Sequence, residues 1–272
     1  MTTGTDRRGR ADLHIHTVAS DGTATVEDIL DHVERNTDLD VIAISDHERI
    51  DAALAARAMA GERGLRFEVV IGEEVTTLGG HLLALFIDRP IRPYRSLRAT
   101  IAAVHEAGGL AIPAHPLVPY PLCAQGWVLR RLLDDPDEAV RPDAIETFNP
   151  TALGRPGHAR ATSFADEHGL AHLGNSDAHA LDAIGSGWTS FPGHTADDLR
   201  RAIAARTTEH GGTFHPTVGQ LGTFGQQLRK RGRDARDELR GRIRRDGTGR
   251  DHGYPGGRLR PPRYEPDSGG RS

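Results

Sequence analysis

The sequence predicts an α/β fold in which a parallel sheet closes into a barrel. Short β-type runs alternate with helical patterns over roughly the first 212 of the 272 residues. Such alternation is typical of strand–helix–strand units, which set parallel strands side by side. Seven strands of this kind suit a barrel better than an open nucleotide-binding sheet, and the chain contains neither GxGxxG nor GxxxxGK[ST].

The expected strands are short runs of mainly apolar residues, several of them rich in β-branched side chains. The first carries two histidines in alternation, and the last ends in an asparagine. In order, these runs are residues 11–16, 40–45, 66–71, 81–87, 110–114, 143–148 and 170–175.

Helical patterns separate most of these runs. Thr25 and Thr195 are expected to cap two of the helices, because each precedes an acidic residue in the first turn. Gly64, Gly108 and Gly169 follow helical patterns, as C-terminal caps do. The expected helices are residues 25–36, 51–64, 94–108, 158–169 and 195–205.

One stretch departs from this alternation. Pro116–Arg131 is rich in Pro, Tyr and Trp. We expect it to be a loop that shapes the mouth of a pocket, or, in the case of Trp127, to contribute to the core.

The end of the chain differs in composition from the rest. From Gln220 onward there are 14 basic and 7 acidic residues, a net charge of +7 within a chain of −4. A barrel domain over residues 10–212 is expected, followed by an extension (213–245) whose helical pattern Gly232 and Gly241 weaken. The basic tail at 246–272 is too poor in apolar residues to offset its ordering entropy, so disorder is expected there.

Cysteine use and hydropathy indicate a compartment. Cys123 is the only cysteine, so the chain has no internal disulfide, which fits a reducing environment. The polar N-terminus resembles no signal peptide, and no run of about 18 apolar residues is present. We therefore expect a cytoplasmic protein with no membrane partner.

Residue types that bind metals recur where the expected strands end. His14 and His16 lie two apart on a strand, so their side chains point to the same side. In a parallel barrel the carboxyl ends of all strands meet on one face, where several ligands would share a pocket. Mixed nitrogen and oxygen ligands suit zinc, manganese or iron. The other such residues are Asp21, Asp46, His47, Glu73, Glu74, His81, His115, Glu146, Asn149, Asp177 and His179.

The motifs DLHIHTVASDG, SDH, GEEVTT, GHLLAL, AHP, ETFN and NSDAH, in this order, resemble the PHP (polymerase and histidinol phosphatase) family over roughly residues 10–212. The stand-alone phosphoesterase branch is the most similar, since no polymerase domain accompanies the motifs. The resemblance implies a distorted seven-stranded β/α (TIM-like) barrel and a site for two or three divalent ions.

The resemblance also implies a role for each matching residue. The first ion would be held by His14, His16, Glu74 and Asp177, which are also the expected catalytic residues. Glu74 would bridge to a second ion held by His115 and His81. Asp21, His47 and His179 would hold the third. Asp46, Glu146 and Asn149 would orient ligands or face the substrate, as carboxylates beside ligating imidazoles commonly do.

Two arginines are candidate phosphate-binding groups. Arg49 follows SDH, where relatives often have Asp-Thr, and a guanidinium there could grip a phosphate as a fork. Arg155 follows the ETFN strand in a similar position. The alternative interpretation of both is an ordinary surface arginine.

The expected function is hydrolysis of a small phosphorylated substrate, such as a nucleotide, by a metal-activated water. One alternative is a 3'-5' or 5'-3' exonuclease on short oligonucleotides, aided by the basic tail; aromatic residues at only 5% do not favour it. A second is a non-catalytic PHP binding module, although such modules lose ligands that this chain keeps. An amidohydrolase-like enzyme is a third, but its usual carbamylated lysine has no counterpart before Lys230, the only lysine.

Overall fold

The computed structural model of the chain describes residues 8–152 and 154–214. The strands are β1 (Gly9–Ile15), β2 (Val41–Ile44), β3 (Glu68–Thr77), β4 (Gly80–Leu85), β5 (Leu110–Pro113), β6 (Ala144–Phe148), β7 (Ala171–Gly174), β8 (Gly187–Phe191) and β9 (Glu209–Gly212). The α-helices are α1 (Val26–Asn36), α2 (Asp51–Arg63), α3 (Leu97–Glu106), α4 (Gly126–Leu133), α5 (His158–His168) and α6 (Ala196–Ala205). Short 3-10 turns occur at η1 (Glu138–Val140), η2 (Arg155–Gly157) and η3 (Leu181–Ala183).

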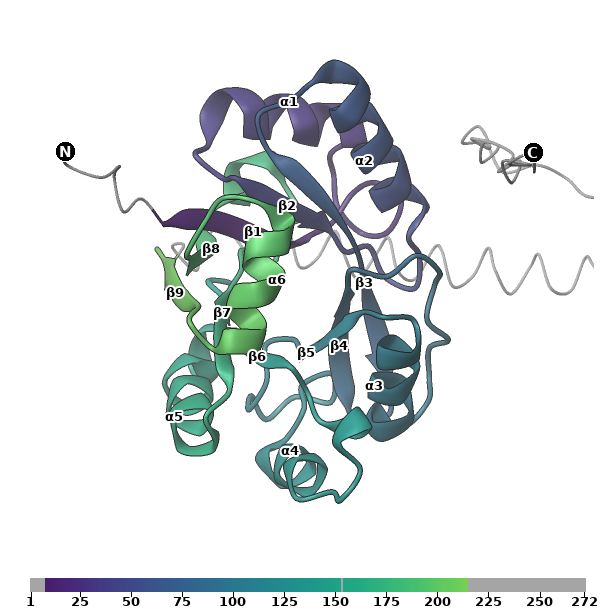
Figure 1. The fold of residues 1–272 in the computed structure, drawn as a ribbon, viewed down its shortest axis with the longest axis vertical. Helices are drawn as coiled ribbons and strands as arrows, with labels where there is room; N and C mark the ends of the chain where they lie inside the picture. Colours follow the sequence, from purple (N-terminus) through teal and green to yellow (C-terminus); the bar gives the residue numbers. More distant parts are fainter. Residues whose placement is uncertain (1–7, 153, 215–272) are drawn as a thin grey trace, which may run out of the picture. The chain divides into compact units, whose positions relative to one another are not determined.

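The predicted α/β class is confirmed, but the sheet is mixed (Figure 1). A curled sheet of seven strands runs in the order β5-β4-β3-β2-β1-β8-β9, and β6 pairs with β7. β1, β2 and β3 are parallel to one another. β4 is antiparallel to both β3 and β5, and β8 is antiparallel to both β1 and β9.

The prediction of a closed seven-stranded barrel is only partly right. In the part of the chain that the structure describes, no strand ladder joins β6 and β7 to the larger sheet, which forms a half-barrel. Single contacts bridge the gap instead. The backbone N–H of Asp143 donates to the carbonyl of Ala111 at 3.0 Å, and the N–H of Gly174 donates to Oγ1 of Thr189 at 3.1 Å.

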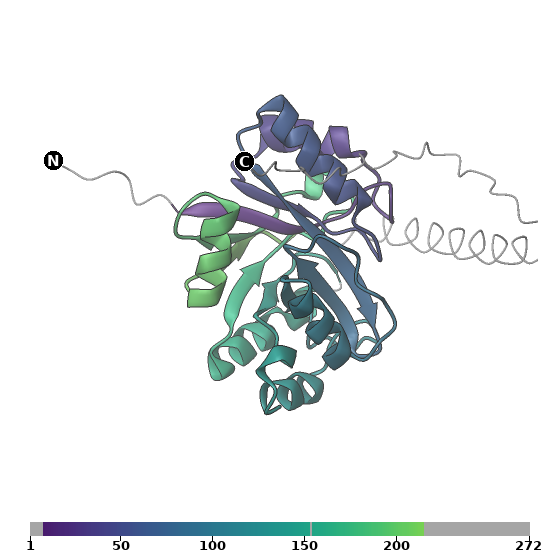
Figure 2. The same ribbon diagram turned by 45° about the vertical axis from the view of Figure 1, so that its right-hand side comes forward.

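The direction of β4 follows from the turn that precedes it. Only Leu78 and Gly79 separate β3 from β4, so the chain doubles back as a hairpin with no crossover helix (Figure 2). The first residues of β4 therefore lie at the edge where β1, β2 and β3 have their carboxyl ends. His81 thus reaches the same edge from the start of a strand.

Strands β8 and β9 were not predicted from the sequence. β8 alternates buried and half-buried residues over only five positions, and β9 is polar and rich in glycine. Neither has enough apolar residues to stand out as a strand. Antiparallel pairing with each other, and of β8 with β1, places both in the sheet.

The predicted helix caps are confirmed at both ends. Thr25 and Thr195 each form a capping box with the acidic residue three positions later. Gly64 and Gly169 adopt the left-handed conformation that ends α2 and α5, with φ of 60° at each. α3 begins at Leu97, later than predicted, because the side chain of Ser96 caps it.

The prediction of a loop over Pro116–Arg131 is wrong in its second half. Helix α4 begins at Gly126 and buries Leu129 and Leu132, four and seven residues after Gln125, its N-cap. Trp127 is not part of the core, since 64% of its surface is exposed. The interpretation based on Pro and Trp content overlooked the apolar spacing that gives this helix one buried face.

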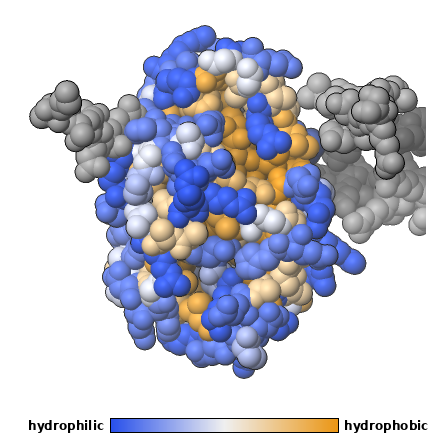
Figure 3. Space-filling view, in the orientation of Figure 1, coloured by the Kyte–Doolittle hydropathy of each residue, from blue (hydrophilic) through white to orange (hydrophobic). Residues whose placement is uncertain are grey.

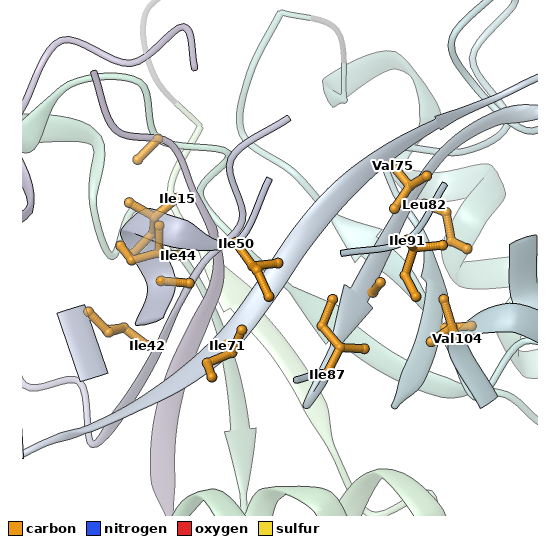
Figure 4. Packing of buried hydrophobic residues seen from close by; sticks show 14 of the residues in the cluster. Ile15, Ile42, Ile44, Ile50, Ile71, Val75, Leu82, Ile87, Ile91 and Val104 are labelled. Carbon is orange, nitrogen blue, oxygen red and sulfur yellow. The ribbon is translucent and has the colours of Figure 1, made fainter. Parts of the chain in front are cut away.

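Two apolar clusters hold the described fold together. One brings Ile15, Ile42, Ile44 and Ile71 of the first three strands against residues of α1 and α2 (Figure 4). The other joins strand residues such as Leu13 to α6. The face seen in Figure 3 is mainly hydrophilic, with hydrophobic residues gathered toward its upper right. Among the described residues no helix is both long and apolar enough to cross a bilayer.

The expected extension and basic tail, residues 213–245 and 246–272, lie outside the described residues apart from Thr213 and Phe214. Their helical and disordered character stays a prediction.

Candidate metal centre

One edge of the half-barrel gathers imidazoles and carboxylates from most of the strands. Most strands contribute residues near or just beyond their carboxyl ends, whereas Glu74 lies inside β3, three residues before its end, and His81 lies at the start of β4. The nine residues predicted as metal ligands, namely His14, His16, Asp21, His47, Glu74, His81, His115, Asp177 and His179, are all brought to this edge. The sheet therefore converts a dispersed set of motifs into one cluster.

The carboxylate of Glu74 lies at the middle of this cluster. Its Oε2 is 3.4 Å from Nε2 of His14, 3.4 Å from Nε2 of His16 and 3.3 Å from Nε2 of His47. Its Oε1 is 2.7 Å from Nδ1 of His81 and 3.2 Å from Nε2 of His115. The two oxygens thus face two separate groups of imidazoles, as a carboxylate shared by two cations would.

Asp177 faces the two histidines of β1. Its Oδ1 is 3.5 Å from Nε2 of His14 and 3.4 Å from Nε2 of His16. The residue has a φ of 52°, an unusual value for a non-glycine residue. His14, His16 and Asp177 form one of the groups whose ligand atoms lie within 4.8 Å of one another.

A third group centres on Asp21, in the loop after β1. Its carboxylate oxygens are 3.2 Å from Nε2 of His179, 3.5 Å from Nδ1 of His16 and 3.6 Å from Nε2 of His47. His16, Asp21, His47 and His179 also form a group within 4.8 Å. His16 has contacts in two groups, through a different ring nitrogen in each.

The donor set fits divalent cations. Nε2 of His14 and His16 are buried, and no hydrogen-bond partner for either occurs within residues 8–152 and 154–214. Burying a polar atom without a partner costs free energy, so such atoms are rarely left in this way. Both nitrogens face carboxylate oxygens across 3.4–3.5 Å, where a cation would satisfy both sides.

The electrostatics favour the cation-binding forms of Glu74 and His16, whereas neighbouring carboxylates outweigh burial and raise the pKa values of His14, His115 and His179. Burial alone would raise the pKa of Glu74, but the neighbouring imidazoles of His81, His47 and His14 hold it well below its usual range. Burial, together with the charge of His179, lowers the pKa of His16 to about 4. An ionised carboxylate and a neutral imidazole are the ligand forms of these side chains.

Glu146 collects four hydrogen bonds beneath the cluster. Its Oε1 accepts from Nδ2 of Asn175 at 2.8 Å and is 3.1 Å from Nδ1 of His14. Its Oε2 accepts from the backbone N–H of His115 at 2.6 Å and from Nδ2 of Asn149 at 3.0 Å. Glu146 therefore fixes the ring of His14 and the backbone of His115.

Two further predicted residues also hold the site in place. Asn149 donates from Nδ2 to Oδ2 of Asp177 at 3.2 Å. Asp46 accepts from the backbone N–H and the hydroxyl of Thr17, at 2.8 and 2.7 Å, and from the hydroxyl of Ser20. It thereby fixes the loop that carries Asp21.

The sequence did not assign roles to Asp12 and Asn175. The buried carboxylate of Asp12 accepts from the backbone N–H of Ser176 at 3.0 Å and of Gly185 at 2.9 Å. Oδ1 of Asn175 accepts from the backbone N–H of Leu13 at 3.0 Å. Both residues stand inside the motifs DLHIH and NSDAH, so proximity to the ligands was the only available signal.

The two arginines make contacts of their own. Arg49 forms two hydrogen bonds of 2.6 Å with the carboxylate of Asp51 and one of 2.8 Å with the carbonyl of Ala19. These contacts favour a structural role, in which Arg49 links the loop after β1 to the start of α2, over binding of a phosphate group. The guanidinium of exposed Arg155 lies 4.9 Å from the centre of the Phe214 ring.

Glu73, one of the metal-binding residue types found where the expected strands end, faces away from the cluster. Its side chain is fully buried on the side of β3 opposite to Glu74, where Oε2 accepts from the backbone N–H of Ile91 at 2.7 Å. Burial raises the pKa of Glu73 to about 7, and the charge of Glu48 adds to the effect. Neighbouring residues on a strand point to opposite sides, and the segment around Ile91 covers the side that Glu73 faces.

A Glu73→Gln variant should therefore be more stable than the wild type at high pH. The folded state holds the Glu73 proton more tightly than the unfolded chain, so wild-type stability falls as the pH rises from 4.5 toward about 7. Glutamine does not titrate, so the variant does not lose stability in this way. Thermal unfolding of metal-free protein should show near-equal stability at pH 4.5 and a variant more stable by about 1–3 kcal/mol at pH 8. Equal stability at both pH values would contradict a buried, protonated Glu73.

Comparison with known proteins agrees with the fold and the motifs. A family model described as PHP-associated matches residues 156–208. The uncharacterized protein MJ1587 of Methanocaldococcus jannaschii is 33% identical over 151 residues, which cover 52% of this chain and 81% of that protein. A second uncharacterized protein of that organism, MJ0417, is 23% identical over 185 residues, covering 67% of this chain and 70% of its own length.

Solved structures with the same fold come from bacteria. One, from Bacteroides vulgatus, is described as a two-domain protein containing a predicted PHP-like metal-dependent phosphoesterase; its TM-score is 0.61 at 20% identity, covering 81% of this chain and 70% of that one. Another is described as an amidohydrolase from Chromobacterium violaceum with bound sulfate; its TM-score is 0.54 at 20% identity, covering 72% and 96%. The chain belongs to the PHP domain family.

Proposed function

We propose that the chain is a metal-dependent hydrolase of phosphate esters and that its substrate is a small phosphorylated metabolite such as a nucleotide. The observation that carries the proposal is the position of Glu74, whose two oxygens face two groups of buried imidazoles. The buried Nε2 atoms of His14 and His16, which have no hydrogen-bond partner among the described residues, support it further.

Two or three divalent cations, of manganese, zinc or iron, are proposed to bind here. His14, His16, Glu74 and Asp177 would hold the first. Glu74, His81 and His115 would hold the second, and Asp21, His47 and His179 the third. Cations bound in such a site lower the pKa of water and offset the charge of a phosphate group.

The protein's own residues would orient the reaction. Glu146 holds the ring of His14, and Asn149 holds the carboxylate of Asp177. Asp177 is the most exposed of the three ligand carboxylates, at 8% against 4% for Asp21 and 1% for Glu74. We propose that Asp177, as the ligand carboxylate nearest to solvent, lies on the side from which water and substrate enter.

A substrate screen tests the function. Purified protein supplied with manganese would be assayed against nucleotides, sugar phosphates, histidinol phosphate, a chromogenic phosphate ester and short RNA. We expect release of phosphate from at least one small ester. Hydrolysis of amides or lactams without any turnover of phosphate esters would instead support the chemistry named for the Chromobacterium violaceum protein.

An exonuclease is the second candidate, and the net charge of +7 from Gln220 onward is the feature that favours it. Basic residues that bind a nucleic-acid backbone make binding strongly dependent on salt. A truncated chain lacking residues 220–272 would be compared with the full chain on short RNA and on a chromogenic ester, between about 50 and 200 mM salt. For a small-molecule enzyme, both forms should respond alike. A steep salt dependence that disappears on truncation, for RNA alone, would favour the exonuclease.

A further inference from the structure

The segment before α4, residues 117–124, packs against the start of β4 beside the proposed metal centre. The backbone N–H of His81 donates to the carbonyl of Leu122 at 2.8 Å, and the N–H of Leu117 donates to the carbonyl of Ala124 at 2.9 Å. Gly80 has a φ of 122°, and a Cβ built on it would lie 2.4 Å from the backbone nitrogen of Ala124. The segment therefore packs on the start of β4 so closely that no side chain fits between them.

This segment places a thiol on one of the candidate ligands. Cys123 is buried, with 2% of its surface exposed, and its Sγ lies 3.4 Å from Nδ1 of His115. The other ring nitrogen, Nε2, lies 3.2 Å from Oε1 of Glu74. The ring of His115 thus lies between the thiol of Cys123 and the carboxylate of Glu74.

Two other imidazoles of the cluster, those of His14 and His179, have an oxygen where His115 has the thiol. Nδ1 of His14 lies 3.1 Å from Oε1 of Glu146, and Nδ1 of His179 lies 2.9 Å from the carbonyl of Asp177. Ligating histidines generally donate their second ring N–H to an oxygen in this way, which fixes the tautomer and the ring orientation. In His115 the partner at the same place is sulfur.

We propose that Cys123 is a positioning residue for His115, a statement that rests on the proposed metal centre. With Nε2 of His115 available to a cation, the ring proton is on Nδ1, which donates to Sγ of Cys123. The weak acceptor holds the ring in the plane that points Nε2 toward Glu74. Cys123 itself touches neither substrate nor cation.

Three variants separate this role from packing. Cys123→Ser keeps an acceptor at the same place, Cys123→Val fills the space without one, and Cys123→Ala does neither. Binding of Mn²⁺ alone would be measured by titration calorimetry on the full chain, because manganese prefers oxygen and nitrogen ligands to thiols. Cys123 is the only cysteine, so no other thiol contributes.

We expect Cys123→Ser to bind Mn²⁺ within about threefold of the wild type, and Cys123→Val to weaken one site by roughly tenfold, the lower end of such effects. Melting temperatures of the metal-free variants report packing separately, and there Cys123→Ala, not Cys123→Val, should be the least stable. Equal Mn²⁺ affinity of Cys123→Val and wild type would overturn the inference. So would a Cys123→Ser variant whose Mn²⁺ affinity is as low as that of Cys123→Val. A wild type that binds no Mn²⁺ would overturn the proposed function as well.

Discussion

A Glu74→Gln variant is expected to lose bound metal and to lose turnover of phosphate esters by roughly 10²–10³-fold or more. Glu74 faces both groups of imidazoles, with Oε2 toward His14, His16 and His47 and Oε1 toward His81 and His115. A neutral amide would leave the mutual repulsion of neighbouring cations without a shared negative charge. Both sites should therefore weaken together.

Glu73→Gln is the matched control for this variant. The two acids are neighbours on β3, but Glu73 points to the opposite side and contacts the backbone of Ile91. Because burial raises the pKa of Glu73 to about 7, an amide replaces a side chain that is about half protonated near pH 7. We expect this variant to keep most of its metal and turnover. Metal analysis and initial rates for both proteins would decide, and an inactive Glu73→Gln beside an active Glu74→Gln would reverse the assignment.

The second large effect is expected for Glu146→Gln. Four hydrogen-bond donors converge on the Glu146 carboxylate, two of them on each oxygen. A glutamine has one carbonyl oxygen, which can accept from one pair of these donors. Its NH₂ group would face the other pair, so that donor would meet donor and two hydrogen bonds would be lost. The ring of His14 and the backbone of His115 should both lose their fixed positions.

We expect Glu146→Gln to weaken metal binding by roughly 10–100-fold and to lose about 1–3 kcal/mol of stability. Titration with Mn²⁺ and thermal unfolding of the metal-free protein measure the two effects separately. Glu106→Gln, an exposed change at the end of α3, should alter neither. A Glu146→Gln variant with unchanged metal affinity would show that Glu146 does not orient the ligands.

Local patterns predicted most elements but not how the sheet closes. Apolar runs and caps such as Thr25 located the strands and helices of the first 212 residues well, because these signals depend on near neighbours. The reversal at Leu78–Gly79 and the pairing of β8 with β1 depend on tertiary contacts. The half-barrel is a consequence of those contacts and has no signature in a single segment.

The candidate site followed more directly from the sequence than the fold did. His14 and His16 alternate on a strand, and a shared sheet edge is enough to bring them to Glu74 and Asp177. The antiparallel direction of β4 even strengthens the case for His81, whose Nδ1 lies 2.7 Å from Glu74. The contact of Cys123 with His115 was not foreseen, because no motif links the two residues and the segment that joins them folds back on β4.

Metal content measured beside activity tests the central claim most directly. Protein purified without added metal would be analysed for transition metals, treated with a chelator, dialysed and assayed on a phosphate ester before and after manganese is restored. We predict two or three bound equivalents, loss of turnover with chelation, and recovery on readdition. A protein that hydrolyses the ester at its full rate with no metal bound would contradict the metal centre and the function proposed from it.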